Sequence, residues 1–261
     1  KIIQGLFIAG QTNGTSGYEE AGCQGLIAGI NAAARLGGEQ PLVLSRAESY
    51  AGVLIDDLVT LGTEEPYRMF TSRAEYRLSL RHDTADLRLA HYGIEAGLVN
   101  DEGKKLLEEK AAALDQLRDL FRNRRIAREE ESLHPGLSGL TGKTLEEALK
   151  VPEMELEAVY SLEPGLTDTD SRIVETAAID IKYEGYLKRQ ESQINRFKKM
   201  EHIKIPEDFD YDGVDGLSNE SRQKLKAITP LSVGQASRIS GVRNSDIAVL
   251  MVAVRRSGND T

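Results

Sequence analysis

The chain has 261 residues, with 33 lysines and arginines against 42 aspartates and glutamates, so its formal net charge is −9. Hydrophobic residues make up 40% of it, enough to bury a core in one large domain or two modest ones. No apolar run approaches the roughly 18 residues of a membrane span. The single cysteine excludes an internal disulfide or a cysteine-based metal cage and fits a reducing compartment. Taken alone, the acidity argues against a nucleic-acid-binding protein.

An apolar stretch near the start predicts a short buried strand from Leu6 to Ala9, ended by Gly10. A loop of small residues follows, and a helix is expected from about Glu19 to Arg35, with Ser16 and Glu19 at the spacing of a capping box. Gly37-Gly38 is expected to stop this helix. A single buried strand needs partner strands. We therefore expect the chain to be part of a longer protein.

Three glycines, Gly22, Gly25 and Gly29, share one face of this expected helix. Glycine costs about 1 kcal/mol per helical position relative to alanine, so the stripe suggests close approach to a sheet or a ligand. A strand, a small-residue loop and a helix start can present backbone N–H groups to an anionic or electron-rich ligand. Neither a phosphate-loop motif nor Gly-x-Gly-x-x-Gly is present, so a ligand site and an ordinary strand–helix turn remain equally open.

The remainder of the chain is predicted to be mainly helical. Between the helices, the second half of residues 67–81 is ambiguous, because Tyr76, Leu78 and Leu80 alternate as in a strand while Arg73, Arg77 and Arg81 share a face as in a helix. Residues 129–170 form an acidic block, mostly loops, with eleven acidic residues against Lys143 and Lys150. A linker is expected from Pro206 to Asp210.

The expected helices are 48–60, 84–93, 101–128, 145–150, 171–200 and three short ones within 218–258. Asn100 is expected to cap the helix 101–128, which has Leu107, Leu114 and Phe121 in an apolar row with Leu106 beside it. Asp168 and Asp170 place negative charge at the start of the helix 171–200.

The predicted fold class is mainly α: the last strand and helix of an α/β domain, a multi-helix domain, and a small helical tail. The expected boundaries are 1–40, 41–205 and 206–261. The four histidines lack metal-ligand spacing, and no Ser/His/Asp set can be assembled, so no metal ligand or catalytic residue is predicted. Cys23 near the helix start is interpreted as a packing residue rather than a reactive thiol.

Charge is unevenly distributed. Residues 66–81 carry +3, residues 182–204 carry +4 and residues 221–256 carry +6, which leaves −22 on the rest of the chain. Arginines beside aromatic residues can hold phosphates and stack on bases, although a solvated helix face is the plainer interpretation. The net charge is therefore an average over opposed segments, and a surface that faces RNA is compatible with it.

The tail has the spacing of a helix-turn-helix: a small residue at Ser237, then Gly241 and Val242, then Ile247. Small helical modules that bind proteins share this spacing. A DNA-binding regulator and a purely structural helical adaptor are therefore kept as alternatives.

Four segments resemble the signatures of the MnmG (GidA) family, in the C-terminal part of that family. They are Gly5–Glu20, Gly62–Leu78, Lys182–Tyr186 and Gly234–Val242. The pair Gly22-Cys23 departs from the Ala-Ala that is usual in the family, so Cys23 is not equated with the family's functional cysteines, which lie upstream of this chain.

The resemblance implies an FAD-dependent enzyme that works with the GTPase MnmE. Such enzymes install an aminomethyl or carboxymethylaminomethyl group on carbon 5 of the wobble uridine of certain tRNAs. Methylene-tetrahydrofolate supplies the carbon, NADH can reduce the flavin, and the protein is a cytoplasmic homodimer. Residues 1–40 would end the FAD-binding domain, and the chain alone is expected to be inactive.

The same resemblance suggests residues that contact FAD, with the helix near Glu19 directed at the pyrimidine edge of the flavin. These cofactor candidates are Gln11, Asn13, Gly14, Thr15, Gly17 and Tyr18. Charge alone suggests contacts to tRNA phosphates, and the tail would dock MnmE or tRNA. These RNA candidates are Arg68, Arg73, Arg77, Lys182, Lys188 and Arg189.

Overall fold

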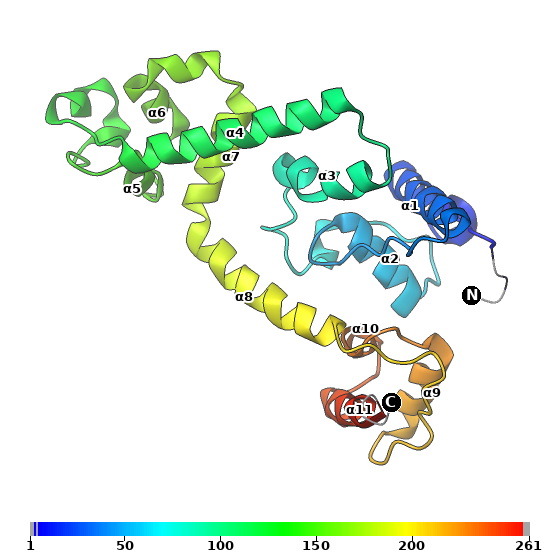
Figure 1. Cartoon of the computed structure of the whole chain (residues 1–261). Helices are drawn as coiled ribbons and strands as arrows, with labels where there is room; N and C mark the ends of the chain where they lie inside the picture. The colour runs from blue at the N-terminus through cyan, green and yellow to red at the C-terminus, as the bar shows by residue number, and fades with distance from the viewer. Residues whose placement is uncertain (1–2, 4, 258–261) are drawn as a thin grey trace. The chain divides into compact units, whose positions relative to one another are not determined.

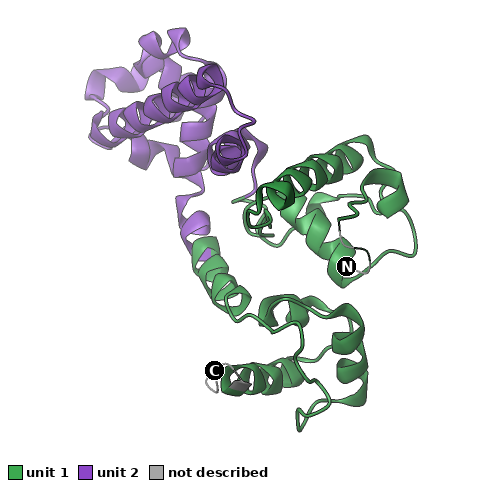
Figure 2. Ribbon diagram, turned by 45° about the vertical axis from the view of Figure 1, so that its right-hand side comes forward, with its two compact units in different colours: residues 1–79, 190–261 green, residues 80–189 purple. Residues whose placement is uncertain are grey.

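The computed structural model describes residues 3 and 5–257, which are helical with irregular connections (Figure 1). The chain divides into two compact units (Figure 2). The first unit comprises residues 1–79 and 190–261, and the second unit comprises residues 80–189. Each unit is described by itself.

The strand predicted from Leu6 to Ala9 is wrong. The segment is irregular, it has no strand partner among the described residues, and the side chains of Leu6, Phe7 and Ile8 are exposed. A strand exists only where a neighbour satisfies its backbone N–H and C=O groups. A 3-10 turn, Gly10–Asn13, follows and leads toward the first helix.

Helix α1 (Tyr18–Gly37) is close to its predicted span, and it ends as predicted at Gly38, whose φ of 72° is the left-handed conformation of a helix C-cap. Its start differs from the prediction by one residue. The N-cap is Gly17 rather than Ser16, and no side chain caps it, so the Ser16–Glu19 capping box is wrong. Around Gly22, Gly25 and Gly29 no heavy atom of the described chain would contact an added Cβ.

Helix α2 (Tyr50–Thr60) begins where the hydroxyl of Ser49 accepts a hydrogen bond from the Gly52 N–H at 2.8 Å. It buries Val53 and Leu54. The ambiguous segment 67–81 is neither a strand nor an α-helix. It contains turns and the 3-10 turn Thr71–Arg73, and Tyr67 makes one isolated bridge with Thr15.

The tail forms a hydrophobic core of the first unit from α9 (Asn219–Ile228), α10 (Val233–Arg238) and α11 (Asn244–Ser257), which confirms the three short helices. The expected linker at 206–210 is flanked by buried Ile205 and Tyr211, and Phe209 packs against the same core. The buried members of this core are Ile205, Tyr211, Val214, Leu217, Leu225, Val233, Ala236, Ile239, Ile247, Leu250 and Val254.

A buried carboxylate joins two of the tail helices. Asp246, in the first turn of α11, accepts hydrogen bonds from the Ser218 N–H at 3.1 Å, the Ser218 hydroxyl at 3.0 Å and the Ser221 hydroxyl at 2.7 Å. The hydrogen bond from Ser221 is the main reason why the pKa of Asp246 lies below its ordinary value.

Asp246→Asn is expected to destabilise the tail by about 1–3 kcal/mol near pH 7, because a charged acceptor of three hydrogen bonds is lost. The folded-state pKa is depressed, so the stabilisation from ionised Asp246 is present above its unfolded pKa and is lost as the pH falls through the folded value. Chemical unfolding should therefore show a difference between wild type and variant that shrinks as the pH falls below the ordinary titration range of an aspartate. Asp208→Asn, at an exposed position, is the control, and a difference independent of pH would contradict this assignment.

The second unit begins with α3 (Ala85–Glu95) and the long helix α4 (Asp101–Asn123). The side chain of Asn100 caps α4 as predicted, accepting from the Gly103 N–H at 2.8 Å. The helix ends at Asn123 rather than Arg128, because Arg124 turns into extended backbone and the neighbouring residue, Arg125, forms a bridge with Thr144. Helix α4 packs against α5 (Leu145–Leu149) and α7 (Ser171–Lys182), as Figure 1 shows.

The acidic block 129–170 is more ordered than predicted. Besides α5 it contains α6 (Leu156–Leu162) and several 3-10 turns, and its apolar residues pack into the core of the second unit. The acidic side chains lie between these buried positions in sequence, and most of them face solvent. The block therefore presents its charged residues on the surface and packs its apolar residues into the core. Its buried residues are Leu137, Leu140, Leu145, Ala148, Leu149, Met154, Ala158, Val159, Leu162 and Leu166.

The single helix predicted over 171–200 is wrong, because Tyr183 separates α7 from α8 (Glu184–Glu201). The start of α7 is as predicted: the Asp170 side chain accepts from the Arg172 N–H at 2.9 Å. In the described part of the chain no helix is both long and apolar enough to cross a membrane. Nor do the described residues contain a group of three His, Cys, Asp or Glu side chains suited to a metal ion.

Candidate cofactor loop and nucleic-acid surfaces

The loop from Gly10 to Tyr18 is held from inside by one side chain of α1, the buried Gln24. Its Oε1 accepts hydrogen bonds from the Gly10 N–H at 3.2 Å and from Asn13 Nδ2 at 2.8 Å. Its Nε2 donates to the Thr15 hydroxyl at 3.0 Å. One amide therefore fixes three points of the loop to the second turn of the helix that follows it.

A second buried side chain, Glu20, closes the start of α1 and is only 6% exposed. Its Oε1 accepts from the Met69 N–H at 2.9 Å and lies 3.7 Å from Arg68 Nε. The bond from Met69 is the main cause that holds the pKa of Glu20 below its usual range. The other oxygen, Oε2, lies where a Cβ on Gly17 would project, so only glycine fits beside this carboxylate.

The buried carboxylate of Glu20 changes the electrostatics expected at this helix start. A negative charge in the first turn interacts favourably with the helix dipole and offsets its positive end. The negative charge of Glu20 therefore partly cancels the positive electrostatic potential of the backbone N–H groups at the start of α1. A flavin edge directed at this helix start would meet that reduced potential.

The six cofactor candidates have different positions in the loop. The side chains of Gln11, Asn13 and Tyr18 are exposed, whereas Thr15 and Gly17 are buried. Gly14 has a φ of 84°, and its carbonyl accepts from the Tyr67 N–H at 2.7 Å. The exposed members form the outer face of the loop, and the buried members hold it in place.

A buried arginine that the sequence did not single out organises the first unit. Arg46 is 6% exposed, and its Nη1 donates to Asp57 at 2.5 Å, to Asp56 at 3.1 Å and to the Val53 carbonyl at 3.3 Å. Its Nη2 donates to Glu75 at 2.9 Å. Burial alone would lower the pKa of Arg46, but the hydrogen bonds to Asp57 and Glu75 raise it, so the guanidinium stays charged.

The same cluster extends to the tail through Arg238, at the end of α10. Arg238 donates to both oxygens of Asp56, at 2.7 and 2.9 Å, and to Glu201 at 2.5 Å. Its guanidinium also lies 5.1 Å from the ring centre of Phe197 on α8. Asp56 therefore joins α2 to the tail by accepting from two arginines.

Three of the six RNA candidates belong to the first unit. Arg68 is exposed and reaches only Glu20, and Arg77 is exposed with no ion pair among the described residues. The Arg73 side chain already makes two contacts within the protein: its Nε donates to the Arg68 carbonyl at 2.9 Å, and its guanidinium lies 4.4 Å from the ring centre of Tyr67.

The other three RNA candidates belong to the second unit, and all are exposed. Lys182 donates to the Pro152 carbonyl at 3.1 Å, Lys188 pairs with Glu184 at 2.6 Å, and the Arg189 guanidinium lies 4.6 Å from the ring centre of Tyr186. The six candidates thus divide equally between the two units.

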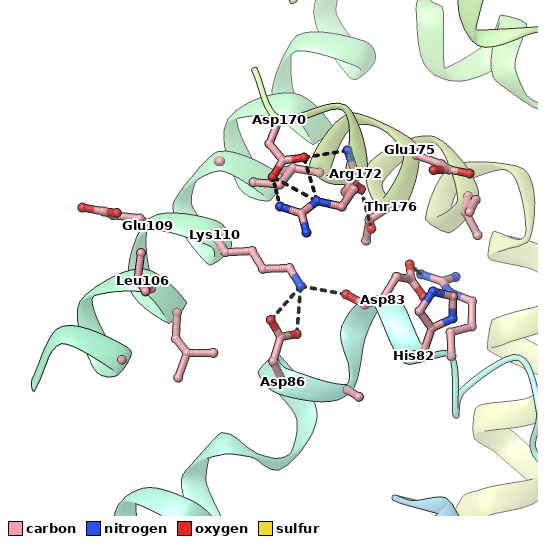
Figure 3. Close-up of a pocket in the computed structure, with 17 residues that line it drawn as sticks. His82, Asp83, Asp86, Leu106, Glu109, Lys110, Asp170, Arg172, Glu175 and Thr176 are labelled. Atoms are coloured by element: carbon pink, nitrogen blue, oxygen red, sulfur yellow. Dashed lines mark hydrogen bonds and ion pairs between the residues drawn. The ribbon is translucent and has the colours of Figure 1, made fainter. Parts of the chain in front are cut away.

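The second unit also contains a groove of about 1170 Å³ that sequence reasoning missed (Figure 3). Lys110 of α4 points into it and donates to the Asp83 carbonyl at 2.7 Å and to both oxygens of Asp86 at 2.8 Å. Across the groove, Asp170 and Arg172 pair at 2.6 Å. Each of these four charges therefore has a partner of opposite sign at the rim of the groove.

Comparisons with known proteins agree with one another over nearly the whole chain. The family described as "Glucose inhibited division protein A" matches residues 1–40. The "tRNA modifying enzyme MnmG/GidA C-terminal helical domain" matches residues 101–191, and the corresponding "C-terminal helical bundle" matches residues 193–261. The loop and helix at the start followed by helical units thus correspond to the C-terminal region of a larger enzyme.

Individual relatives are similar throughout. Proteins of Treponema denticola and Caldicellulosiruptor saccharolyticus, both named tRNA uridine 5-carboxymethylaminomethyl modification enzyme MnmG, are 49% and 51% identical over 96% and 97% of this chain. The solved structure of Aquifex aeolicus GidA in its form II crystal is 42% identical over 97% of this chain, with a TM-score of 0.83. The chain belongs to the MnmG/GidA family, and it spans about two fifths of the length of these relatives, 41% in each case.

The helix-turn-helix alternative finds no support in these comparisons. The tail does have two helices joined by a tight turn, with Gly241 at a φ of 87°. However, residues 193–261 match the helical bundle of a tRNA-modifying enzyme. The basic side chains of the tail are also largely paired: Lys224 with Glu220, Lys226 with Asp212, and Arg238 with Asp56.

Proposed function

We propose that this chain is the C-terminal part of an FAD-dependent enzyme that modifies carbon 5 of the wobble uridine of tRNA. The main support for this proposal is that the chain is 49% identical, over 96% of its length, to a protein named tRNA uridine 5-carboxymethylaminomethyl modification enzyme. Residues 1–40 would complete the flavin-binding domain, and the helical remainder would contact tRNA. The GTPase MnmE as partner, a homodimer, and a cytoplasmic location belong to the same proposal.

The loop from Gly10 to Tyr18 supports the FAD part of the proposal. Its inner face is fixed by Gln24 and Glu20, and the Asn13 amide donates inward to Gln24, while the amide of Gln11 is exposed and can hydrogen-bond a polar ring edge. The open glycine face of α1 leaves room for another layer to approach its backbone. Bound there, FAD supplies two-electron redox chemistry, with NADH and methylene-tetrahydrofolate as co-substrates.

What this chain contributes is therefore positioning. Gln24 holds the loop in one conformation, so the exposed amide of Gln11 is carried on a backbone that needs little ordering when a ligand binds. Glu20 ties the helix start to Met69, which fixes the loop against the segment that carries Arg68 and Arg73. No catalytic residue is assigned to this chain.

If the helical region contacts tRNA, removing the exposed positive charge of Arg77 should weaken tRNA binding. In the full-length protein, Arg77→Gln should weaken tRNA binding several-fold and lower the dependence of log K on log salt by about one unit, as expected when one phosphate contact is lost. Lys105→Gln removes an equally exposed charge from α4, outside the predicted surface, and should leave binding unchanged. Filter binding over a salt series measures both.

Two results would contradict the proposed function as a whole. One is equal, weak binding of the full-length protein to tRNA and to duplex DNA. The other is the absence of a bound-flavin absorption spectrum after the full-length protein has been purified, incubated with excess FAD and freed of unbound FAD.

A further inference from the structure

The break between α7 and α8 places two tyrosines on the surface at one point of the second unit. Tyr183 is 38% exposed and Tyr186 is 57% exposed, with ring centres 6.3 Å apart. The N–H groups of Tyr186 and Leu187 both donate to the Tyr183 carbonyl at 2.9 Å, so the junction has a defined backbone. The ring planes are inclined by 59°, so the two tyrosines are not stacked face to face on each other.

Between these tyrosines lies a glycine that the fold itself does not require. Gly185 is in the first turn of α8 and is not among the described glycines with positive φ. An added Cβ there would meet no heavy atom within 4 Å. Glycine lowers helix stability relative to alanine, so neither conformation nor packing explains it. Its absent side chain leaves the backbone between the two rings open to close approach from outside.

Cationic side chains surround the same point. Lys182, Lys188 and Arg189 are exposed, against Glu184, which pairs with Lys188. The Arg189 guanidinium carbon lies 4.6 Å from the ring centre of Tyr186, within the range of a cation–π contact. Flat rings, a guanidinium plane and excess positive charge are the combination that receives unstacked nucleobases with their phosphates.

We propose that this junction, the tyrosine platform formed by Tyr183, Gly185, Tyr186 and Arg189, binds unpaired nucleotides of an RNA by base stacking, with Lys182 and Lys188 near the phosphates. The proposal rests on the proposed function and narrows it to the single-stranded part of the substrate. A duplex hides the faces of its bases, so the platform discriminates unpaired from paired RNA. Every base has a π-face, so stacking tolerates sequence.

The test uses the full-length protein and two probes: a short RNA stem-loop with an unpaired loop, and the same stem as a fully paired duplex. Tyr186→Leu should bind the stem-loop about ten-fold more weakly, because one base–aromatic stack is lost, and should bind the duplex as wild type does. Tyr186→Phe keeps the ring and should restore stem-loop binding. Fluorescence anisotropy gives both affinities.

Gly185→Ala tests the open backbone without removing any group that contacts RNA. Its stability should equal or exceed that of wild type, since alanine favours the helix, while its affinity for the stem-loop falls several-fold. Gly165→Ala is the matched control, because Gly165 is also exposed with no heavy atom within 4 Å of an added Cβ. Thermal unfolding and anisotropy are measured on both variants.

Unchanged stem-loop affinity in Tyr186→Leu and Gly185→Ala would overturn the platform. Equal losses on the stem-loop and the duplex would overturn it too, because stacking requires unpaired bases. Either failure leaves the proposed function standing if wild type still binds tRNA in preference to duplex DNA. Loss of that preference in wild type would instead contradict the proposed function.

Discussion

Arg46→Ala is expected to destabilise the first unit by about 3–5 kcal/mol, because removing one partner from a buried ion-pair cluster leaves the others uncompensated. The guanidinium donates to Asp56, Asp57 and Glu75, and Asp57 is itself buried. Without Arg46, the Asp57 carboxylate retains the Tyr67 hydroxyl at 2.7 Å but loses its closest cation. Chemical unfolding gives the stability loss, and hydrogen exchange of peptides from α2 and residues 67–75 locates it.

Arg46→Lys separates charge from geometry at the same position. Lysine keeps the positive charge but not the planar fork that reaches several acceptors at once, so its loss should be intermediate. Arg77→Ala, at an exposed arginine of the same unit, should change stability by no more than about 0.5 kcal/mol. A loss below 1 kcal/mol for Arg46→Ala would show that the cluster is screened by solvent despite its 6% exposure.

The Arg46 cluster also shows what spacing in a sequence leaves out. Arg46 and Glu75 are 29 positions apart, and Asp56 and Arg238 are 182 positions apart. No helical or strand period relates such pairs. Arg238 was counted among the free charges of the tail, although it is held between Asp56 and Glu201. Net charge over a segment therefore overstates how much of that charge can meet a nucleic acid.

Elements fixed by local signals were predicted well. The end of α1 at Gly38 depends on a left-handed residue, the start of α4 on the Asn100 cap, and the tail helices on apolar spacing. Each signal lies within a few residues of the feature it specifies. The C-terminal end of α4 was missed because the bridge between Arg125 and Thr144, distant in sequence, ends it.

Predictions failed where tertiary contacts decide the structure, or where the acidic composition of a segment concealed its apolar spacing. In 129–170 the acidic residues suggested loops, while apolar residues at helical spacing, such as Leu156 and Val159 in α6, specified a core. The break at Tyr183 has no proline to mark it. The strand at Leu6 was predicted from apolarity, with partner strands expected from a longer protein, and no partner for it lies among the described residues.

The candidate cofactor loop was located from its small residues, but not the side chains that hold it. Gln24 and Glu20 are four positions apart, so they share one face of α1, and both are buried polar groups. That spacing was readable in the sequence beside the glycine stripe. Their partners, Gly10 and Met69, were not, because Met69 lies 49 positions from Glu20.

The second large effect is expected at Phe121, which is fully buried on α4 at 0% exposure. Phe121→Ala should destabilise the second unit by about 3–5 kcal/mol, the loss of a buried aromatic side chain plus the cavity that remains. Leu106→Ala on the same helix is the matched control. Leu106 was placed beside the predicted apolar row, but it is 60% exposed and should cost no more than about 0.5 kcal/mol.

Hydrogen exchange decides where the destabilisation from Phe121→Ala is confined. Phe121 belongs to the core that includes Leu145, Val159 and Val174, whereas α9 and α11 bury a separate core around Leu225 and Leu250. Peptides of α4, α5 and α7 should therefore lose protection while those of α9 and α11 keep it. Equal loss in both sets would mean that the two cores unfold as one cooperative unit, and equal stabilities of the Phe121 and Leu106 variants would mean that burial at α4 was misassigned.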